Sequence, residues 1–515
     1  MSCVKLAALL ESTLPPVQGY RTGSTGVPHC HGWVCLAPRP CAGYHPVRTT
    51  TNSRSSYLKD QRTLPRLIMG AALLIYCATL ITLSCLKHAT YHSALIDLGI
   101  FDQVIWNTAH GHFYWDTLDP FVQRNHVFLG QHFSPGIAIL ALPYLIAPSV
   151  YTLLVAQTLA LASGAIPLYV LAARRTSDER IAALLGVAYL LYPSLAFANL
   201  FDFHEIVLAV PCLAWAIERL DAGRWRTAVV LLSIALLFKE EVGLIVAAFG
   251  AYAFLGRRQR ILGIGLLALG LGWTAGVVFL AVPHIRGGPY LFEGRYQGGL
   301  LQQGSLHLAY LTHFLNSDKL GYVGLLLAPL LALPLLGGWS LLLPAPTIAY
   351  TLLSTYPLQY NIHYHYAAPL IPLLFAGTVF GLTRLAPRYR LRVAFLVLAA
   401  VAVTGVAIGP LPWQRDFAAS TYTMGPRERA MEHLVSLVRP DAVLAVDNQM
   451  GAHLTERRWV THFFTGYEHA EVLLFDLQER SATEAKRLRA VAAIQHDPSW
   501  RLVARENDIV LYVRR

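Results

Sequence analysis

The sequence predicts a mainly α-helical protein: a polytopic transmembrane helical bundle with interfacial helices and a small C-terminal α/β domain outside the cytoplasm. The first observation is composition, since 55% of the 515 residues are hydrophobic and 14% are charged, which is typical of a membrane protein. The second is a series of apolar runs separated by short connections. The third is that these connections are of two kinds, basic or rich in acids and histidine.

The formal net charge of +11 could indicate a nucleic-acid ligand. The excess lies in short connections between apolar runs and in the N-terminal stretch, so membrane topology accounts for it and we expect no nucleic-acid partner. None of the seven cysteines lies in the predicted outer loops or the C-terminal domain, so no disulfide framework is expected there.

The chain is expected to begin with an extension that takes no part in the fold. Residues 1–60 show no sustained apolar period and no signal-peptide pattern, and we interpret them as disordered or mis-annotated. Arg62 and Arg66 then precede the apolar run 67–86, which is long enough to cross about 30 Å of hydrocarbon. Because flanking bases keep that end of a span inside, residues 88–131 are expected outside.

The apolar stretch 132–149 is interrupted by Pro135, Pro143 and Pro148. If it crossed the membrane, Arg174-Arg175 would lie outside and every later connection would contradict the charge rule, so we predict an interfacial or re-entrant segment. The spans after it are expected at 151–172, 180–199, 205–219, 226–239, 241–256, 261–283, 320–336, 339–356, 362–383 and 391–410. With the first span they make eleven, in a transmembrane domain 64–411 with outer loops 88–149 and 284–319.

The last part of the chain, 412–515, is more charged and is predicted to be a soluble extracytoplasmic α/β domain. Residues 442–446 and 472–475 are typical of buried strands, and 481–495 have helical periodicity. The runs 501–504 and 509–513, on either side of Glu506-Asn507-Asp508, predict a hairpin.

The two kinds of connection are expected on opposite sides of the membrane. Basic connections mark the cytoplasmic side and are found at 174–175, 219–226, 257–260 and 384–392. The other connections, at 97–102, 202–205, 239–241 and 363–365, therefore converge on the outer side. Ionisable groups at the ends of spans are costly unless they have a role there, so this side is the candidate functional site.

Two residues of the first outer loop are candidates for catalysis and phosphate binding. Asp97 could act as a general base on an acceptor hydroxyl, or it could cap the interfacial helix that follows. His132, just before the interfacial segment, could bind a phosphate or be a solvated histidine at the membrane interface.

Two clusters come from the connections between later spans. Asp202, His204 and Glu205 have side chains that suit a divalent cation, although capping of the next span accounts for at least one of them. Lys239, Glu240 and Glu241 are three successive charges between short apolar runs, and they form either a substrate site or a tight outer turn with its own Lys–Glu pair.

Three further residues complete the candidate site. His363 and His365 can face one way only in an extended segment, so a joint metal site requires non-helical backbone, and placement in an aromatic belt is the alternative. Arg295, in the Gly-rich outer loop, could hold a phosphate with two hydrogen bonds.

At these residues the chain resembles a bacterial family of polytopic membrane proteins described as a domain of unknown function. The resemblance covers about 64–515 and is carried by the segments 97–103, 132–135, 203–205, 238–241 and 363–366. That family is similar to the GT-C glycosyltransferase superfamily, which includes aminoarabinose transferases and protein mannosyltransferases. The resemblance implies a GT-C fold and a polyprenyl-phosphate sugar as donor.

The resemblance also implies roles for three residues. An Asp in the first outer loop is essential in the superfamily, and Asp97 matches it by position, with Asp102 as the rival. His132 stands where related transferases carry a basic residue before a Pro-containing interfacial helix, but this chain lacks the Lys-Pro-Pro form found there.

The leading hypothesis is therefore an inverting transfer of a sugar from a polyprenyl-phosphate carrier to an outer-face acceptor, in a bacterial inner membrane. Arg295, Lys239 and His132 would neutralise the lipid phosphate. The acid and His clusters would bind sugar hydroxyls or a divalent cation, and no other cofactor is implied. The alternatives are a lipid or solute transporter or flippase, and a non-catalytic envelope scaffold.

Overall fold

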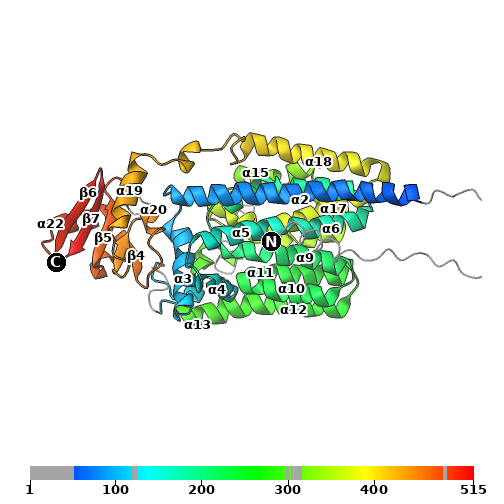
Figure 1. The fold of residues 1–515 in the computed structure, drawn as a ribbon. Helices are drawn as coiled ribbons and strands as arrows, with labels where there is room; N and C mark the ends of the chain where they lie inside the picture. Colours follow the sequence, from blue (N-terminus) through cyan, green and yellow to red (C-terminus); the bar gives the residue numbers. More distant parts are fainter. Residues whose placement is uncertain (1–51, 119–124, 297–300, 303–304, 307–315, 480–483) are drawn as a thin grey trace, which may run out of the picture. The chain divides into compact units, whose positions relative to one another are not determined.

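The computed structural model describes residues 52–118, 125–296, 301–302, 305–306, 316–479 and 484–515 (Figure 1). Most of the predicted N-terminal extension, 1–60, lies outside the described residues. The chain divides into two compact units, Met1–Leu64 and Pro65–Arg515, and the site described below belongs to the second. The predicted start of a C-terminal domain, residue 412, falls within that second unit.

The apolar runs of the sequence form helices, as their composition predicts. The α-helices of this part are α2 (Asn52–Ala89), α3 (Ile100–Ala109), α4 (Ala141–Tyr144), α5 (Tyr151–Ser163), α6 (Ala165–Thr176), α7 (Glu179–Leu190), α8 (Pro193–Leu200), α9 (Ala209–Asp221), α10 (Trp225–Ala235), α11 (Val242–Ala251), α12 (Arg260–Gly276), α13 (Val282–Arg286), α15 (Ser317–Leu327), α16 (Ala345–Leu353), α17 (Leu370–Thr383) and α18 (Pro387–Ile408). Between them lie short 3-10 and π segments: η1 (Leu95–Gly99), η2 (Phe128–Gly130), η3 (Pro135–Leu140), η4 (Glu205–Leu208), η5 (Leu236–Phe238), η6 (Tyr252–Gly256), η7 (Val277–Ala281), η8 (Leu291–Tyr296), η9 (Ala328–Leu330), η10 (Leu333–Leu342), η11 (Pro357–Tyr360) and η12 (His365–Ala367).

The number of full-length spans is smaller than predicted. Among the described residues, four helices are long and apolar enough to cross a membrane, and two bent helix pairs raise the number to six if each pair is one span. The four are Thr63–Ala89, Tyr151–Thr176, Arg260–Arg286 and Pro387–Ile408. The prediction of eleven spans is therefore wrong as a count. Several of the other predicted spans are apolar helices of 10–17 residues, which at 1.5 Å per residue are shorter than about 30 Å of hydrocarbon.

One bent pair takes the place of the predicted span 320–336, and α16 (Ala345–Leu353) forms most of the predicted span 339–356. Ser317–Leu330 and Leu333–Leu342 meet at an angle of 111°. Pro329 and Pro334 interrupt helical hydrogen bonding on either side of the bend. Between the two prolines, Leu331 and Ala332 adopt φ angles of 52° and 51°, which a continuing right-handed helix cannot contain.

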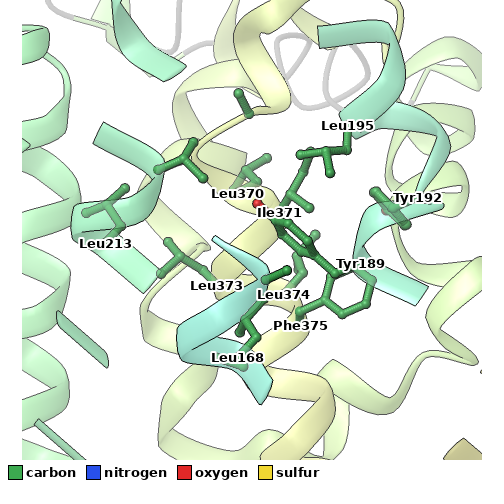
Figure 2. Close-up of a cluster of buried hydrophobic side chains, with 14 of the residues drawn as sticks. Leu168, Tyr189, Tyr192, Leu195, Leu213, Leu370, Ile371, Leu373, Leu374 and Phe375 are labelled. Carbon is green, nitrogen blue, oxygen red and sulfur yellow. The ribbon is translucent and has the colours of Figure 1, made fainter. Parts of the chain in front are cut away.

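Helix α17 is the centre of the helical core. Every residue from Leu370 to Leu382 is buried, as expected for a helix that is apolar on all sides. Phe375 meets the rings of Tyr189 and Tyr192 edge-on, each at 5.4 Å between centroids. Figure 2 shows this cluster, in which side chains of α17 gather with those of α6, α7, α8 and α9.

Three of the basic connections meet at one set of ion pairs. Asp221, at the end of α9, pairs with Arg174 and Arg175 in the last turn of α6 and with Arg257 after η6. Arg174 also pairs with Glu218. Basic connections that are distant in the sequence therefore lie on the same end of the helical part, as the charge pattern predicts.

The predicted interfacial segment 132–149 contains one short apolar helix. It runs from Pro135 to Tyr144 through η3 and α4, too short to cross a bilayer. Tyr144 is buried against α3, where its hydroxyl donates a 2.6 Å hydrogen bond to Asp102. Two of the three prolines that argue against a span, Pro135 and Pro143, thus fall in an element that packs against α3.

The C-terminal residues form a small mixed sheet, with the order β4-β3-β5-β7-β6. Strands β3 (Leu444–Val446), β4 (Val460–His462) and β5 (Val472–Asp476) are parallel, and β5 pairs antiparallel with β7 (Ile509–Arg514). The predicted hairpin is confirmed: β6 (Trp500–Glu506) pairs with β7 around Asn507, which has a φ of 52°. The remaining elements are η13 (Ala419–Tyr422), α19 (Pro426–Ser436), α20 (Asn448–Gly451), α21 (Phe463–Gly466), η14 (Tyr467–His469) and α22 (Glu484–His496).

Candidate functional site

A cavity of about 280 Å³ lies among the acid- and His-rich connections. Segments from very different parts of the sequence line it: the first loop, the turn after α8, the break between η5 and α11, the η8 loop and the segment before α17. The residues of the predicted site that line it are Asp97, His132, His204, Lys239, Glu241, Arg295 and His365.

Asp97 reaches the cavity from the π-helical turn η1, and its side chain is 28% exposed. Its Oδ1 lies 3.6 Å from Nε2 of His204. The carboxylate caps no helix here, because the N-cap residues of η1 and α3 are Ala94 and Gly99 and neither helix has a side-chain cap. The capping interpretation of Asp97 is therefore wrong, and the carboxylate faces the cavity.

His204 and His365 form a stacked pair in the cavity wall. Their ring centroids are 3.5 Å apart at an interplanar angle of 14°, and Phe201 stacks on His204 at 5.2 Å. Two protonated imidazoles at this distance would repel one another. His204 is the member that faces Asp97.

Two cations line the cavity, and their environments differ. Lys239 is buried and pairs with Glu205, with Nζ 3.1 Å from Oε1. Arg295 has no carboxylate within 4.0 Å among the described residues. Its guanidinium lies over two rings, 4.2 Å from the centroid of Phe292 and 4.5 Å from that of Tyr356. Arg295 is held by stacking, and no described residue accepts a hydrogen bond from its guanidinium, so the group can bind an anionic ligand.

Glu240 lies behind the cavity wall and organises it. It accepts hydrogen bonds from the hydroxyl of Tyr290 at 2.8 Å and from the backbone N–H of Phe133 at 3.1 Å. Nδ1 of His132 lies 3.1 Å from the same carboxylate, and the His132 ring stacks on Phe292 at 4.7 Å. Burial alone would raise the pKa of Glu240, but His132 and Lys239 hold it below its usual value, so the group is a carboxylate.

Five predicted site residues do not line the cavity, and their partners explain why. Asp102 is buried and accepts 2.6 Å hydrogen bonds from Tyr144 and Thr455. His363 is exposed, with Nδ1 2.6 Å from Oδ1 of Asn361, whereas His365 is buried. The prediction that the outer connections converge on one cavity is thus wrong for Glu240 and His363: neither lines the cavity, since Glu240 binds Tyr290 and His132 and His363 binds Asn361.

Asp202 and Glu205, the other two, each form an ion pair with a lysine. Asp202 accepts hydrogen bonds from Nζ of Lys87 at 2.8 Å, from Ser93 at 3.0 Å and from the backbone N–H of Ala94 at 3.0 Å. The cluster of Asp202, His204 and Glu205 does not form a cation site, since one acid pairs with Lys87 and the other with Lys239. Among the described residues, no group of three or more His, Cys, Asp or Glu side chains is placed to hold a metal ion.

The sequence interpretation missed the aromatic and amide groups of the cavity. These include Tyr290, Phe292, Tyr296, Tyr356, Tyr364, Tyr366, Gln131 and Gln359. A signal was present, because Tyr364 and Tyr366 alternate with the histidines of 363–366. Aromatic side chains at the ends of spans are common for interfacial reasons, so sequence alone gave no ground to assign them to a site.

Comparisons with known proteins agree with a membrane fold of this type. Residues 87–511 match the family model described as "Predicted membrane protein (DUF2079)". The crystal structure of ArnT from Cupriavidus metallidurans bound to undecaprenyl phosphate is similar in fold, with a TM-score of 0.50 and 14% sequence identity over 85% of this chain and 97% of that chain.

A second solved structure matches less well. The oligosaccharyltransferase of Archaeoglobus fulgidus, in a complex with Zn and sulfate, has a TM-score of 0.44 and 13% identity over 79% of this chain and 68% of that chain. These two structural neighbours are GT-C glycosyltransferases. A search of curated proteins found no match.

Proposed function

The chain belongs to the DUF2079 family of predicted membrane proteins, and on that premise we propose that it is a membrane glycosyltransferase. It moves a sugar from a polyprenyl-phosphate donor to an acceptor on the outer face of a bacterial inner membrane. The observation that carries the proposal is one cavity lined by the Asp97 carboxylate and by two cations, Lys239 and Arg295. The fold of a solved transferase bound to undecaprenyl phosphate supports it.

The reaction is a direct displacement at C1 of the sugar. The acceptor hydroxyl forms a new bond to C1 and gives its proton to the carboxylate of Asp97, which acts as general base. The bond from C1 to the phosphate oxygen breaks, and its electron pair stays on the polyprenyl phosphate. This step inverts the configuration at C1 and forms no covalent intermediate with the protein. It therefore needs one base, which is the role proposed for Asp97.

The cations stabilise the phosphate as its negative charge grows. Arg295 presents its N–H groups in a planar fork that can bind two phosphate oxygens. Lys239 carries a charge that Glu205 partly offsets, so it contributes less to ground-state binding. Positioned cations in a cavity shielded from water act most strongly on charge that develops during the reaction.

The remaining cavity groups suit a sugar ring. Tyr290, Tyr356 and Tyr366 contribute aromatic surface to the cavity, and Gln359 is buried with Oε1 unpaired by any described residue. Such groups provide apolar surface together with a few oriented hydrogen bonds, which is the usual composition of a small-ligand site. We therefore assign the binding of the sugar hydroxyls to these protein groups.

The experiment is a transfer assay on the purified protein in detergent, with a panel of undecaprenyl-phosphate sugars and release of undecaprenyl phosphate as the readout. Wild-type protein should release the lipid phosphate, and Asp97→Asn should lower the rate at least about a hundredfold, in the range of a lost general base. Asp318→Asn, an exposed acid on α15, is the matched control and should retain the wild-type rate. Full activity of Asp97→Asn would remove Asp97 from the reaction.

A further inference from the structure

The C-terminal part of the chain contacts the turn that carries Asp97. Residues 448–460, which run from α20 to the start of β4 and are called here the docking segment, pack on η1 and α3. The turn has two faces. Ile96, Asp97, Ile100 and Phe101 line the cavity, whereas the docking segment meets the opposite face.

The first contact is one residue before Asp97. Oδ1 of Asn448 accepts a 3.2 Å hydrogen bond from the backbone N–H of Ile96. This N–H belongs to the first turn of η1, where a helix offers its own N–H groups no internal partner. Asn448 therefore fixes the backbone at the entrance to the turn.

The second contact follows Asp97. Thr455 donates a 2.6 Å hydrogen bond from Oγ1 to Oδ2 of Asp102, which is buried. The methyl group of Thr455 lies so close to Gly99 that an added Cβ at residue 99 would be 3.0 Å from it. One threonine thus holds both the end of η1 and the first turn of α3.

Further along the same face, two more contacts continue the interaction. The side chain of Gln103 donates to the carbonyl of Arg458 at 3.2 Å. Thr117 donates to the carbonyl of Val460 at 2.6 Å and accepts from its N–H at 3.2 Å. His453, which also belongs to the docking segment, stacks on the rings of His88 and Tyr91, with centroid distances of 4.0 and 3.9 Å.

We propose that the docking segment positions Asp97 in the cavity, with Asn448 and Thr455 as the positioning residues. The C-terminal part is then an integral part of the site and not only a surface that holds an acceptor. The consequence for sugar transfer rests on the proposed function, but the positioning itself does not.

The first test measures the backbone of the turn by hydrogen exchange on the full-length protein in detergent. Thr455→Val keeps the shape of the side chain and removes the hydrogen-bond donor. Backbone amides of 95–99 should then exchange at least about tenfold faster than in wild type, because the free energy of local unfolding of this turn is lower. Thr455→Ser keeps the donor and should stay close to wild type. Thr423→Val, at an exposed threonine outside the docking segment, should leave these amides unchanged. Equal exchange at 95–99 in Thr455→Val and wild type would overturn the proposal, whether or not the chain transfers sugar.

The second test separates positioning from general stability by kinetics. Thr455→Val and Asn448→Ala should each lower kcat about tenfold with KM for the donor nearly unchanged, because a misplaced base slows the reaction more than binding. Thr455→Ser should restore most of kcat. A wild-type kcat in both variants would overturn the role in transfer while leaving the proposed function standing, and an inactive wild-type protein would overturn the proposed function alone.

Discussion

Lys239 and Glu205 form an ion pair in the wall of the cavity, with Nζ 3.1 Å from Oε1 and side chains that are 3% and 0% exposed. Their segments, the break before α11 and the 3-10 turn before α9, are brought together by the packing of the helices. Removing one member of a buried pair leaves an unpaired charge, whereas removing both leaves none.

The first prediction concerns this pair. Lys239→Met should destabilise the protein by about 3–5 kcal/mol, the usual cost of an uncompensated buried charge. The double variant Lys239→Met, Glu205→Gln should recover much of the lost stability, measured as the apparent melting temperature in detergent. It should not recover sugar transfer. A double variant that melts no higher than Lys239→Met would show that the pair does not hold this part of the structure.

The second prediction concerns Arg295, which has stacking partners and no carboxylate partner among the described residues. Arg295→Gln should raise the Kd for undecaprenyl phosphate about 10- to 100-fold, because a hydrogen bond to a charged group is worth about 1.5–3 kcal/mol. The melting temperature should hardly change. Arg295→Lys should be intermediate, since it keeps the charge and loses the planar fork. Arg501→Gln, at an exposed arginine of β6, is the control, and an unchanged Kd in Arg295→Gln would exclude this phosphate site.

The third prediction is a pH dependence that comes from Asp102. Burial raises the pKa of Asp102 to about 7, against the hydrogen bonds from Thr455 and Tyr144, which lower it. A carboxyl whose pKa is raised on folding stabilises the fold while it is protonated, and this contribution is lost as the pH rises through the folded pKa. The apparent melting temperature of wild type should therefore fall more than that of Asp102→Asn between about pH 5 and about pH 8. Asp441→Asn, whose native side chain is 82% exposed, should follow wild type, and parallel curves for Asp102→Asn and wild type would contradict the prediction.

The fourth prediction concerns sidedness. In a background without the native cysteines, Asp441→Cys should react with a membrane-impermeant maleimide in spheroplasts. Arg226→Cys, on the exposed start of α10, should react only after the membrane is permeabilised, because basic connections stay in the cytoplasm. The reverse pattern would place the cavity on the cytoplasmic side and would rule out an outer-face acceptor.

Local features of the sequence predicted several parts of the fold well. The charged connections, the proline-interrupted segment 132–149 and the hairpin around Asn507 each depend on neighbouring residues, so their signals can be read from short stretches. The number of spans could not be predicted in this way. A segment is equally hydrophobic whether it is buried in lipid or in the protein interior, so hydrophobicity does not identify a span. The bend at Leu331 and Ala332 depends on backbone angles that composition does not reveal.

By itself, the sequence determined that this is a helical membrane protein and that acids, histidines and single cations gather at the ends of its helices. Only the tertiary structure decided which of these groups are free. Asp97 faces the cavity while Asp102 is bound by Tyr144 and Thr455, and His365 lines the wall while His363 turns outward. The physical reason is that a polar group becomes available when packing brings no partner to it, and those partners come from segments far away in the chain.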